Sequence, residues 1–466
     1  MIIRSVESII AMLDADYIEN DDIQKRIGGV SIDSRKVVEG NLYIPIKGVR
    51  HNGHKFIEEA IANGAAATLW NRDEPNPPKE ITVILVDDTT AGLQQLAAVY
   101  RRQLLMRVVG ITGSNGKTST KDILAGMLSQ KFRTQKTLGN LNNEIGVPLT
   151  LLSMSEQTQV AVVEMGMENS GELAFLSHMV KPDIAIITNV GIAHLENLGS
   201  LANIAKAKAE ISEGLSGHGT LIYNGDQELL HDAITRKALN GHIRIKTFGE
   251  DKHNDMVLTH VVQSTDGISF GVNDEDVHFT MNMLGRHQAI NATAALLCAR
   301  EWNLSDEEIQ EGLKRIEKTG MRNELIPIHN AWILNDSYKS NPQSCIAALD
   351  TLAIFDVPYK IAVLSDMLDL GDESDMIHFQ LGKQLANYDL DEVLTYGKMG
   401  AFITQGALQE CDRHVRIRHF EEKEQMVRYL KPYRKKRCMM LIKGSHSMKM
   451  DEVVAALCEN DHKRQR

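Results

Sequence analysis

Residues 107–120 read RVVGITGSNGKTST, in which an apolar strand runs into a glycine-rich turn and then into a helix predicted over 119–128. Gly113 and Gly116 allow the turn to bring backbone N–H groups close to an anion. The free N–H groups and the dipole at the start of a helix favour the same anion. The stretch therefore predicts a phosphate-binding loop within an α/β domain.

Two side chains at the end of this turn add to the predicted loop. The Lys117 ammonium reaches phosphate oxygens, and the Thr118 hydroxyl can ligate Mg²⁺. Position 111 is Ile111, where the common Gly-x-x-x-x-Gly-Lys-Thr pattern has glycine. The shorter Gly-x-x-Gly-Lys-Thr loop indicates a particular family of nucleoside triphosphatases, and a solvated lysine on a glycine-rich turn is the alternative.

The bulk properties describe a large globular protein. At about 150 residues per domain, 466 residues predict three domains. A composition of 43% apolar and 24% charged residues is ordinary, and the net charge of -11 argues against a nucleic-acid binder. Five scattered cysteines favour reduced thiols in the cytoplasm. Glu7 and Asp14 interrupt the N-terminal apolar residues, so we expect neither a signal peptide nor a membrane span.

The alternation of strand and helix patterns predicts three α/β domains. We expect an N-terminal mixed α/β domain over 1–87, a central domain with a mostly parallel sheet over 88–321, and a C-terminal alternating domain over 322–466. The runs 160–163 and 184–187 are apolar throughout, as in strands covered on both faces. Strands of the third domain are predicted at 332–335, 360–364, 393–396 and 439–442.

Two candidate metal ligands follow the central strands. Glu164 ends the run 160–163, which places its carboxylate at the sheet edge where ligands of open α/β sheets bind, and there it can hold Mg²⁺. His194 follows the run 184–187 and arrives at the same edge, where it can ligate a second divalent ion or orient a carboxylate. A structural glutamate–arginine pair and a solvated loop histidine are the alternatives.

A helix predicted to begin near Ser200 carries a lysine on its apolar stripe. Ile204, Lys208 and Ile211 are spaced by four and three residues, so Lys208 points where the apolar side chains point and Lys206 does not. Burial lowers the pKa of an amine, and a neutral amine reacts with CO₂ to give a carbamate, an anionic ligand for Mg²⁺. By the stripe alone, a lysine stem that snorkels to water is the favoured outcome, and the buried amine is the alternative.

Polar side chains in two further loops are candidates for substrate contacts. The loop 137–148 offers amide donors and acceptors suited to sugar hydroxyls and peptide groups, with Asx-turns as the alternative. Its amide residues are Asn140, Asn142 and Asn143. In the N-terminal domain, Ser34 and Arg35 offer a hydroxyl and a guanidinium group to an anion.

Ordered motifs along nearly the whole chain resemble the Mur ligase family. They are SIDSRKVVEGNLYIPIKG, TGSNGKTSTK, TLGNLNNEIGVPLTLL, VVEMGM, ITNVGIAHLENLGS, IAKAKAEI, LGRHQAINATAAL, TGMRNE, NDSYKSNP and LIKGSHSMK. They are most similar to the members that add D-alanyl-D-alanine to UDP-N-acetylmuramoyl-tripeptide. The resemblance implies a UDP-muramoyl-peptide-binding N-terminal domain, a P-loop-type ATP-binding central domain, and a Rossmann-like C-terminal domain that contacts the acceptor and the nucleotide.

The resemblance also implies a role for each matching residue. It implies ATP binding by Gly113, Ser114, Asn115, Gly116, Lys117, Thr118, Ser119, Asn291, Arg322 and Asp336. It implies contacts to the UDP-muramoyl-peptide by Ser34, Arg35, Asn140, Asn142 and Asn143, and to the acceptor by Lys443, Gly444 and Ser445. The implied metal ligands are Thr118, Glu164, His194 and Lys208 as its carbamate, N6-carboxylysine. The implied catalytic residues are Lys117, Glu164, His194 and Lys208.

The activity implied by the resemblance is ATP- and Mg²⁺-dependent amide synthesis through an acyl phosphate, a cytoplasmic step of peptidoglycan precursor synthesis. The implied partners are small molecules, UDP-N-acetylmuramoyl-tripeptide and D-alanyl-D-alanine, and we expect a monomer that binds no nucleic acid and inserts into no membrane. A related ligase with another acceptor, as in the folylpolyglutamate branch, and a catalytically weak nucleotide-binding paralogue are the alternatives.

Several positions depart from the family's usual motifs. Lys339 and Ser340 stand where Asn and Ala are usual, so a cation replaces a neutral amide beside the nucleotide. Ser365 stands where Gly is usual, and His446 and Ser447 stand where Arg and Gly are usual. Loss of an arginine removes a bidentate carboxylate contact that histidine does not replace. We therefore expect the changes at the last two motifs to affect the acceptor and the level of activity more than ATP binding.

Overall fold

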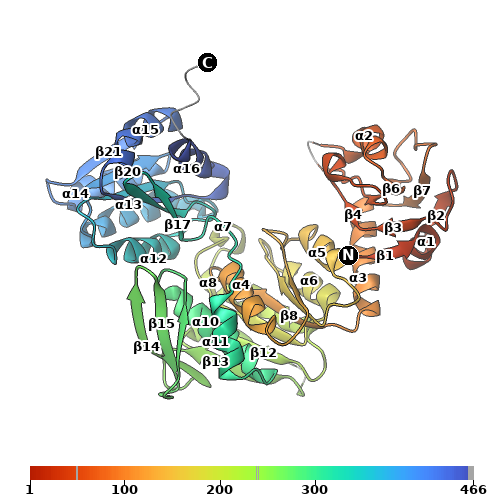
Figure 1. The fold of residues 1–466 in the computed structure, drawn as a ribbon, viewed down its shortest axis with the longest axis horizontal. Coiled ribbons are helices and arrows are strands. Elements are labelled where there is room, and N and C mark those ends of the chain that lie inside the picture. Colours follow the sequence, from red (N-terminus) through yellow and green to blue (C-terminus); the bar gives the residue numbers. More distant parts are fainter. Residues whose placement is uncertain (49–50, 238, 240, 460–466) are drawn as a thin grey trace.

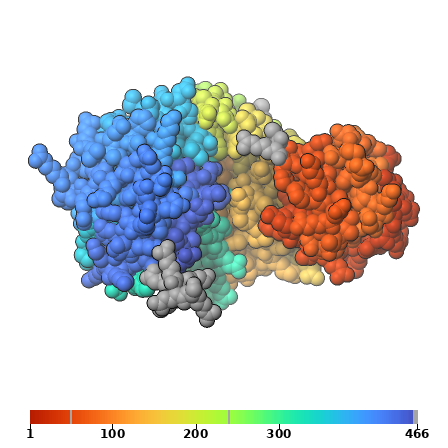
Figure 2. Space-filling view, turned by 90° about the horizontal axis from the view of Figure 1, so that it is seen from above, coloured from red at the N-terminus to blue at the C-terminus, as the bar shows by residue number. Residues whose placement is uncertain are grey.

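The structure contains four β-sheets, and the three larger ones follow one another along the chain, each as the framework of one part of the molecule (Figure 1). The computed structural model describes residues 1–48, 51–237, 239 and 241–459. Figure 2 shows the N-terminal part as a separate lobe at one end, while the C-terminal part lies against the central part at the other. The α/β fold in three successive parts agrees with the expectation from sequence.

The N-terminal part combines a five-stranded sheet with a two-stranded ribbon. Its strands are β1 Ile3–Ser5, β2 Asp16–Ile18, β3 Arg26–Gly28, β4 Val30–Ser31, β5 Leu42–Tyr43, β6 Ala67–Asn71 and β7 Thr82–Val86. Its helices are α1 Val6–Leu13 and α2 Ile57–Ala62, and 3-10 turns span Ser34–Lys36 and Gly53–Phe56. The sheet order is β2-β7-β6-β5-β4, in which only β2 runs antiparallel to its neighbour, and β1 pairs with β3.

Helix α3, Thr89–Gln103, connects the N-terminal and central parts. The Asp88 carboxylate caps it by accepting a hydrogen bond from the Ala91 N–H at 2.7 Å. Leu93, Leu96 and neighbouring apolar side chains of α3 lie in one hydrophobic core that includes residues of both parts. The helix therefore begins at Thr89, directly after this cap.

The central part contains a nine-stranded sheet. Its strands are β8 Arg107–Thr112, β9 Thr134–Lys136, β10 Val160–Glu164, β11 Ile184–Ile187, β12 Thr220–Asn224, β13 Arg244–Gly249, β14 Met256–Ser264, β15 Gly267–Val272 and β16 His278–Met281. The order is β16-β15-β14-β13-β12-β11-β8-β10-β9, parallel except for the pairs that involve β15. The strands predicted at 160–163 and 184–187 are confirmed as β10 and β11.

Helices cover both faces of the central sheet. They are α4 Lys117–Leu128, α5 Gly146–Ser153, α6 Glu172–Val180, α7 Leu195–Leu198, α8 Leu201–Ala209, α9 Glu228–Thr235, α10 His287–Glu301 and α11 Asp306–Lys314. On β10, Val160 and Val162 pack into one core with α4, α10 and α11, and Ala161 and Val163 pack into the other with α5 and α6. Burial on both faces explains why these strands are apolar throughout.

The C-terminal part is a six-stranded Rossmann-like sheet with helices on both faces. Its strands are β17 Glu324–Ile328, β18 Ala331–Asp336, β19 Lys360–Ser365, β20 Glu392–Tyr396, β21 Arg416–Phe420 and β22 Met439–Lys443, in the order β17-β18-β22-β19-β20-β21. Its helices are α12 Pro342–Ala353, α13 Ser374–Gln384, α14 Gly400–Glu410, α15 Lys423–Leu430 and α16 Asp451–Cys458. Only β17 is antiparallel to its neighbour. The four predicted strands are confirmed, and the edge strands β17 and β21 were missed.

The predicted domain boundaries fall in segments that connect the sheets. Strand β7 ends at Val86 and strand β17 begins at Glu324, so the boundaries after residues 87 and 321 interrupt no sheet. These boundaries stay predictions. Among the described residues, none of the helices combines the length and the apolar character needed to cross a lipid bilayer.

Helices α4 and α11 pack closely because glycines face each other. A Cβ added at Gly312 would lie 2.4 Å from the Met127 Cα and 2.6 Å from the Gly126 carbonyl oxygen, and these backbone atoms cannot move aside. We expect Gly312→Ala to force the helices apart and lower the free energy of unfolding by about 1–3 kcal/mol. Urea unfolding measures the change. Gly217→Ala is the matched control because nothing lies within 4 Å of its added Cβ, and equal stabilities of both variants would contradict the prediction.

Candidate active site

A cavity of about 870 Å³ lies at the carboxyl edge of the central sheet, and the C-terminal part completes its wall. The loops after β8, β10 and β11 and helix α10 line it on one side, and the segment after β18 lines it on the other. The predicted site residues among its lining are Ser114, Asn115, Gly116, Lys117, Thr118, Ser119, Asn142, Asn143, Glu164, His194, Asn291, Arg322, Asp336 and Lys443. The structure thus brings most of the predicted nucleotide and metal residues together.

The glycine-rich loop requires its glycines. Gly113 has φ 151° and Gly116 has φ 80°, values that side chains disfavour. A Cβ at Gly113 would lie 1.8 Å from the Thr188 Oγ1, and a Cβ at Gly116 would lie 2.3 Å from the Asn291 Oδ1. Helix α4 begins directly after the loop, and no side chain caps its N-terminus. Its first N–H groups therefore suit an anion.

The Lys117 ammonium lies within this loop. Its Nζ donates a hydrogen bond to the Gly113 carbonyl oxygen at 2.7 Å. Burial, followed by the charge of Lys339, lowers the pKa of Lys117 to about 7, although Glu164 acts in the opposite direction. A bound phosphate would counter the repulsion from Lys339 and favour the charged form of Lys117.

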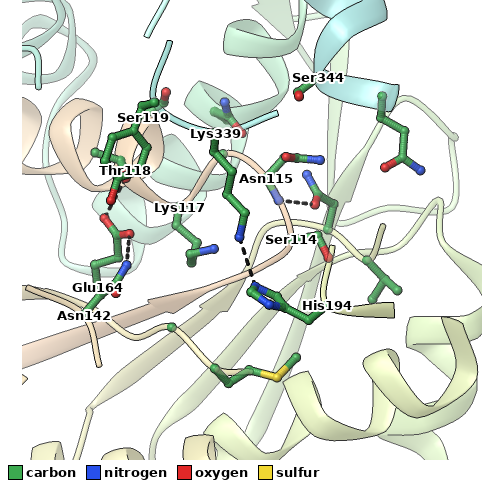
Figure 3. Close-up of a pocket in the computed structure, with 18 of the residues that line it drawn as sticks. Ser114, Asn115, Lys117, Thr118, Ser119, Asn142, Glu164, His194, Lys339 and Ser344 are labelled. Atoms are coloured by element: carbon green, nitrogen blue, oxygen red, sulfur yellow. Dashed lines mark hydrogen bonds between the residues drawn. The ribbon is translucent and has the colours of Figure 1, made fainter. Parts of the chain in front are cut away.

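The Glu164 carboxylate is buried and accepts hydrogen bonds from neutral donors (Figure 3). Its Oε2 accepts from the Thr118 hydroxyl at 2.8 Å, and its Oε1 accepts from the Asn142 amide at 2.7 Å. Its cationic neighbour is Lys121, whose Nζ lies 3.9 Å from Oε2, so the glutamate–arginine alternative is wrong. Thr118 and Glu164 present the hard oxygen donors that Mg²⁺ prefers, and they fit that ion.

His194 lies at the edge of the same cavity and contacts a lysine of the C-terminal part. Its Nε2 accepts a hydrogen bond from the Lys339 Nζ at 3.0 Å (Figure 3). Its Nδ1 lies 4.0 Å from the Asp369 Oδ2. Burial, followed by the charge of Lys339, lowers the pKa of His194 to about 3, so the imidazole is neutral at pH 7. The alternative of a solvated loop histidine is wrong, because the side chain is 11% exposed.

Lys208 lies buried on helix α8, on the apolar stripe where the sequence placed it. Its residue exposure is 1%, so the favoured outcome of a stem that snorkels to water is wrong. Burial lowers its pKa well below the usual value, and the charges of Lys117 and Lys339 act in the same direction. The helix ends at Ala209 and continues as a 3-10 turn over Glu210–Gly214. Its carbamylation stays a prediction.

Lys443 connects two neighbouring strands of the C-terminal sheet. It lies opposite Asp336 in the parallel register of β22 and β18. Its Nζ donates to the Asp336 Oδ2 at 2.5 Å and to the Lys339 carbonyl oxygen at 2.9 Å. The predicted acceptor residues Gly444 and Ser445 are not part of the cavity lining. A Cβ added at Gly444 would lie 2.0 Å from the Ser365 Oγ. The hydroxyl of Ser365, one of the positions that depart from the family's motifs, therefore packs against the backbone of Gly444.

The segment after β18 also contacts the glycine-rich loop. The Asn341 Nδ2 donates to the Asn115 Oδ1 at 2.8 Å, and the Asn341 Oδ1 caps helix α12 by accepting from the Ser344 N–H at 2.9 Å. The Arg322 guanidinium carbon stacks over the Tyr338 ring, 4.2 Å from the ring centroid. The C-terminal part is therefore held against the phosphate loop through side chains near residue 340.

The remaining predicted substrate residues lie apart from the cavity or serve local turns. The Ser34 hydroxyl donates to the Glu59 Oε2 at 2.5 Å, and the Arg35 guanidinium pairs with Asp33 at 2.8 Å, both in the N-terminal part. The Asn143 Oδ1 accepts a hydrogen bond from the Gly146 N–H at 2.9 Å, so this side chain serves the local turn that was the alternative to a substrate contact. Asn140 lies beside Tyr338. Their substrate roles stay predictions.

Sequence reasoning missed one buried cation of the site. The Lys121 side chain is fully buried, with its Nζ 3.5 Å from the Asp122 Oδ1 and 3.9 Å from the Glu164 Oε2. The signal was its position four residues after Lys117, which places both lysines on one face of α4. It was also not foreseeable that Lys339 contacts His194.

Three family models match the chain. The Mur ligase family catalytic domain matches residues 26–101, the Mur ligase middle domain matches 111–299, and the Mur ligase glutamate ligase domain matches 321–446.

Curated relatives and solved structures are similar over most of the chain. The UDP-N-acetylmuramoyl-tripeptide--D-alanyl-D-alanine ligase of Bacillus subtilis is 42% identical over 99% of both chains. The structure of MurF from Acinetobacter baumannii has 28% identity and a TM-score of 0.87, covering 99% of this chain and 100% of that one. The MurF ligase of Thermotoga maritima in complex with ADP has 27% identity and a TM-score of 0.78, covering 92% and 96%.

The contribution of the Lys443–Asp336 ion pair to the stability of the protein can be tested by mutation. Lys443→Met leaves the Asp336 carboxylate, 15% exposed, without its buried cation, and we expect a loss of about 3 kcal/mol in the free energy of unfolding. Denaturant titration measures it. Asp336→Asn in the same chain should restore part of the loss, because the uncompensated charge is removed. The exposed Lys398→Met is the control, and a Lys443→Met variant as stable as this control would contradict the prediction.

Proposed function

This chain belongs to the Mur ligase family, and from that membership we infer that it is an ATP-dependent ligase that joins D-alanyl-D-alanine to UDP-N-acetylmuramoyl-tripeptide. The observation that carries the inference is 42% identity over 99% of both chains to a relative of that name. The product is a precursor of peptidoglycan. The cavity at the edge of the central sheet, with its phosphate loop, supports the same activity.

The reaction is amide synthesis through an acyl phosphate. The peptide carboxylate attacks the γ-phosphorus of ATP and ADP leaves. The amine of D-alanyl-D-alanine then attacks the acyl carbon, phosphate leaves, and the amine loses a proton. The Lys117 ammonium and the first N–H groups of α4 stabilise negative charge on the phosphoryl oxygens. The walls from the central and C-terminal parts limit the access of water to the acyl phosphate. Orientation of the two substrates contributes roughly 7 kcal/mol or more to lowering the barrier.

The metal assignment follows from the donor set. Thr118 and Glu164 would hold Mg²⁺ through their oxygen atoms, 2.8 Å apart. When bound, the ion neutralises charge on the transferring phosphoryl group. Asn142 orients the other oxygen of Glu164 through a hydrogen bond of 2.7 Å. Asn291, Arg322 and Asp336 are assigned to the nucleotide.

The remaining roles concern the flanking domains. We assign residues 1–87 to the UDP-muramoyl-peptide, with Ser34 and Arg35 at its diphosphate, residues 88–321 to ATP, and residues 322–466 to the acceptor and nucleotide. The protein acts as a cytoplasmic monomer on small-molecule substrates. Five free cysteines among the described residues suit a reducing compartment.

Lys208 is assigned a carbamate. Its lowered pKa makes the neutral amine available, and attack of the nitrogen lone pair on CO₂ gives a carbamate with release of one proton. The carbamate removes the positive charge from a site that already holds Lys117 and Lys339. Its anionic oxygens are suited to Mg²⁺ or to orienting a water molecule that binds it.

A ligation assay tests the function. Purified protein with ATP, Mg²⁺, D-alanyl-D-alanine and UDP-N-acetylmuramoyl-tripeptide should yield ADP, phosphate and the pentapeptide precursor, identified by mass. The tripeptide is supplied with lysine or with diaminopimelate at its third residue. Absence of ligation with both would reject the function. Preferential addition of glutamate to a folate would identify the folylpolyglutamate alternative, and nucleotide binding without turnover would identify the non-catalytic one.

A second prediction concerns Lys208. We expect Lys208→Ala to lower the ligation rate by roughly 100-fold or more, because the anionic group is lost, and acetate or formate to restore part of it. Rates with and without added carboxylate measure the effect. Lys206→Ala, on the exposed side of α8, should keep the wild-type rate. A Lys208→Ala variant as active as wild type would exclude the carbamate.

A further inference from the structure

The segment after β18 places a cation of the C-terminal part against a histidine of the central part. Lys339 follows Tyr338 in the segment 337–341, and its Nζ lies 3.0 Å from the His194 Nε2 (Figure 3). The contact places a positive charge directly against one predicted metal ligand.

Three contacts fix the backbone that carries this lysine. The Lys339 carbonyl oxygen accepts a hydrogen bond from the buried Lys443 Nζ at 2.9 Å. The next residue, Ser340, contacts the Cys345 Sγ through its hydroxyl at 3.2 Å. Asn341 is bonded to Asn115 at 2.8 Å. The lysine thus extends from an anchored segment into the cavity, and its direction is set by the fold.

The contact uses the atom that a metal would need. A neutral imidazole has one nitrogen lone pair, and on His194 the nitrogen that accepts from Lys339 is Nε2. The other nitrogen, Nδ1, lies 4.0 Å from the Asp369 Oδ2, so that side of the ring faces a carboxylate. A divalent cation at Nε2 would also be repelled by the adjacent ammonium.

The surrounding charges act in the same direction. Lys117 lines the same cavity as His194 and Lys339, so its ammonium adds to the repulsion of a second divalent cation there. The carboxylate that accepts from Thr118 belongs to Glu164, on the other side of the Lys117 side chain in the view of Figure 3. The donor set for one divalent cation is thus intact at Thr118 and Glu164, whereas the predicted ligand His194 is occupied by a cation of the protein itself.

We propose that the Lys339 ammonium takes the place of a second divalent cation at His194, so that the nucleotide complex of this protein holds a single divalent cation, at Thr118 and Glu164. Lys339 supplies one fixed positive charge at that side of the cavity. The proposal rests on the proposed function only in that a metal–nucleotide complex enters this cavity. Removal of the ammonium frees the His194 lone pair and opens a place for a second ion.

Manganese counting tests the proposal. Electron paramagnetic resonance of free Mn²⁺, titrated into full-length protein saturated with a nonhydrolysable ATP analogue, gives the number of ions bound per chain. We expect one for wild type and two for Lys339→Asn, with a spin-coupled signal from the pair. Lys339→Asn combined with His194→Ala should return to one. The matched control is Lys206→Asn on the exposed side of α8, which should bind one ion.

Several results would overturn the proposal. Two ions bound to wild type would do so, as would one ion in a Lys339→Asn variant whose thermal unfolding matches that of wild type. Should that variant fail to fold, His194→Ala alone decides: an unchanged count and a manganese Kd within twofold of wild type support the proposal, and a tenfold weaker Kd overturns it.

The count and the ligation assay separate this proposal from the proposed function. A protein that binds one manganese ion with the nucleotide analogue but forms no pentapeptide product supports the present proposal and rejects the function. A protein that ligates D-alanyl-D-alanine while binding two ions keeps the function and overturns the present proposal.

Discussion

The parallel register of β8, β10 and β11 is the constraint on which the site depends. Hydrogen bonding places Glu164 opposite Ile111 and Ile187 opposite Thr112, so all three strands end at one edge of the sheet. The phosphate loop is tied to the end of β11, since the Ser114 N–H donates to the Asn189 carbonyl oxygen at 2.9 Å. Shifting one strand would separate the lysine of the loop from the carboxylate that faces it.

That edge brings together lysines from both parts of the molecule. Burial lowers the pKa values of Lys117, Lys208 and Lys339. The charge of Lys339 acts in the same direction on the other two lysines, and the charge of Arg322 does so on Lys339. Such an arrangement costs stability in the absence of an anion and is favourable once a triphosphate is bound, which is a common compromise at active sites. The C-terminal part contributes Lys339, so the charge at the site depends on how the two parts are docked.

The features that could be predicted from the sequence are those that a short stretch of residues determines. The loop around Lys117 and the strand 160–163 each follow from a short pattern. The apolar stripe predicted the direction of the Lys208 side chain but not the burial of its amine. Strand β21 was missed because its RIRHF sequence is charged and lies at an exposed edge. The contact between Lys339 and His194 joins residues 145 positions apart and depends on the docking of two domains, which no local pattern contains.

A crystal structure with a nonhydrolysable ATP analogue and Mg²⁺ tests the central claim most directly. The account predicts that the terminal phosphate lies within hydrogen-bond distance of the Lys117 Nζ and the first N–H groups of α4, with the metal between that phosphate and the oxygens of Thr118 and Glu164. A terminal phosphate bound away from the loop 113–118 would contradict it.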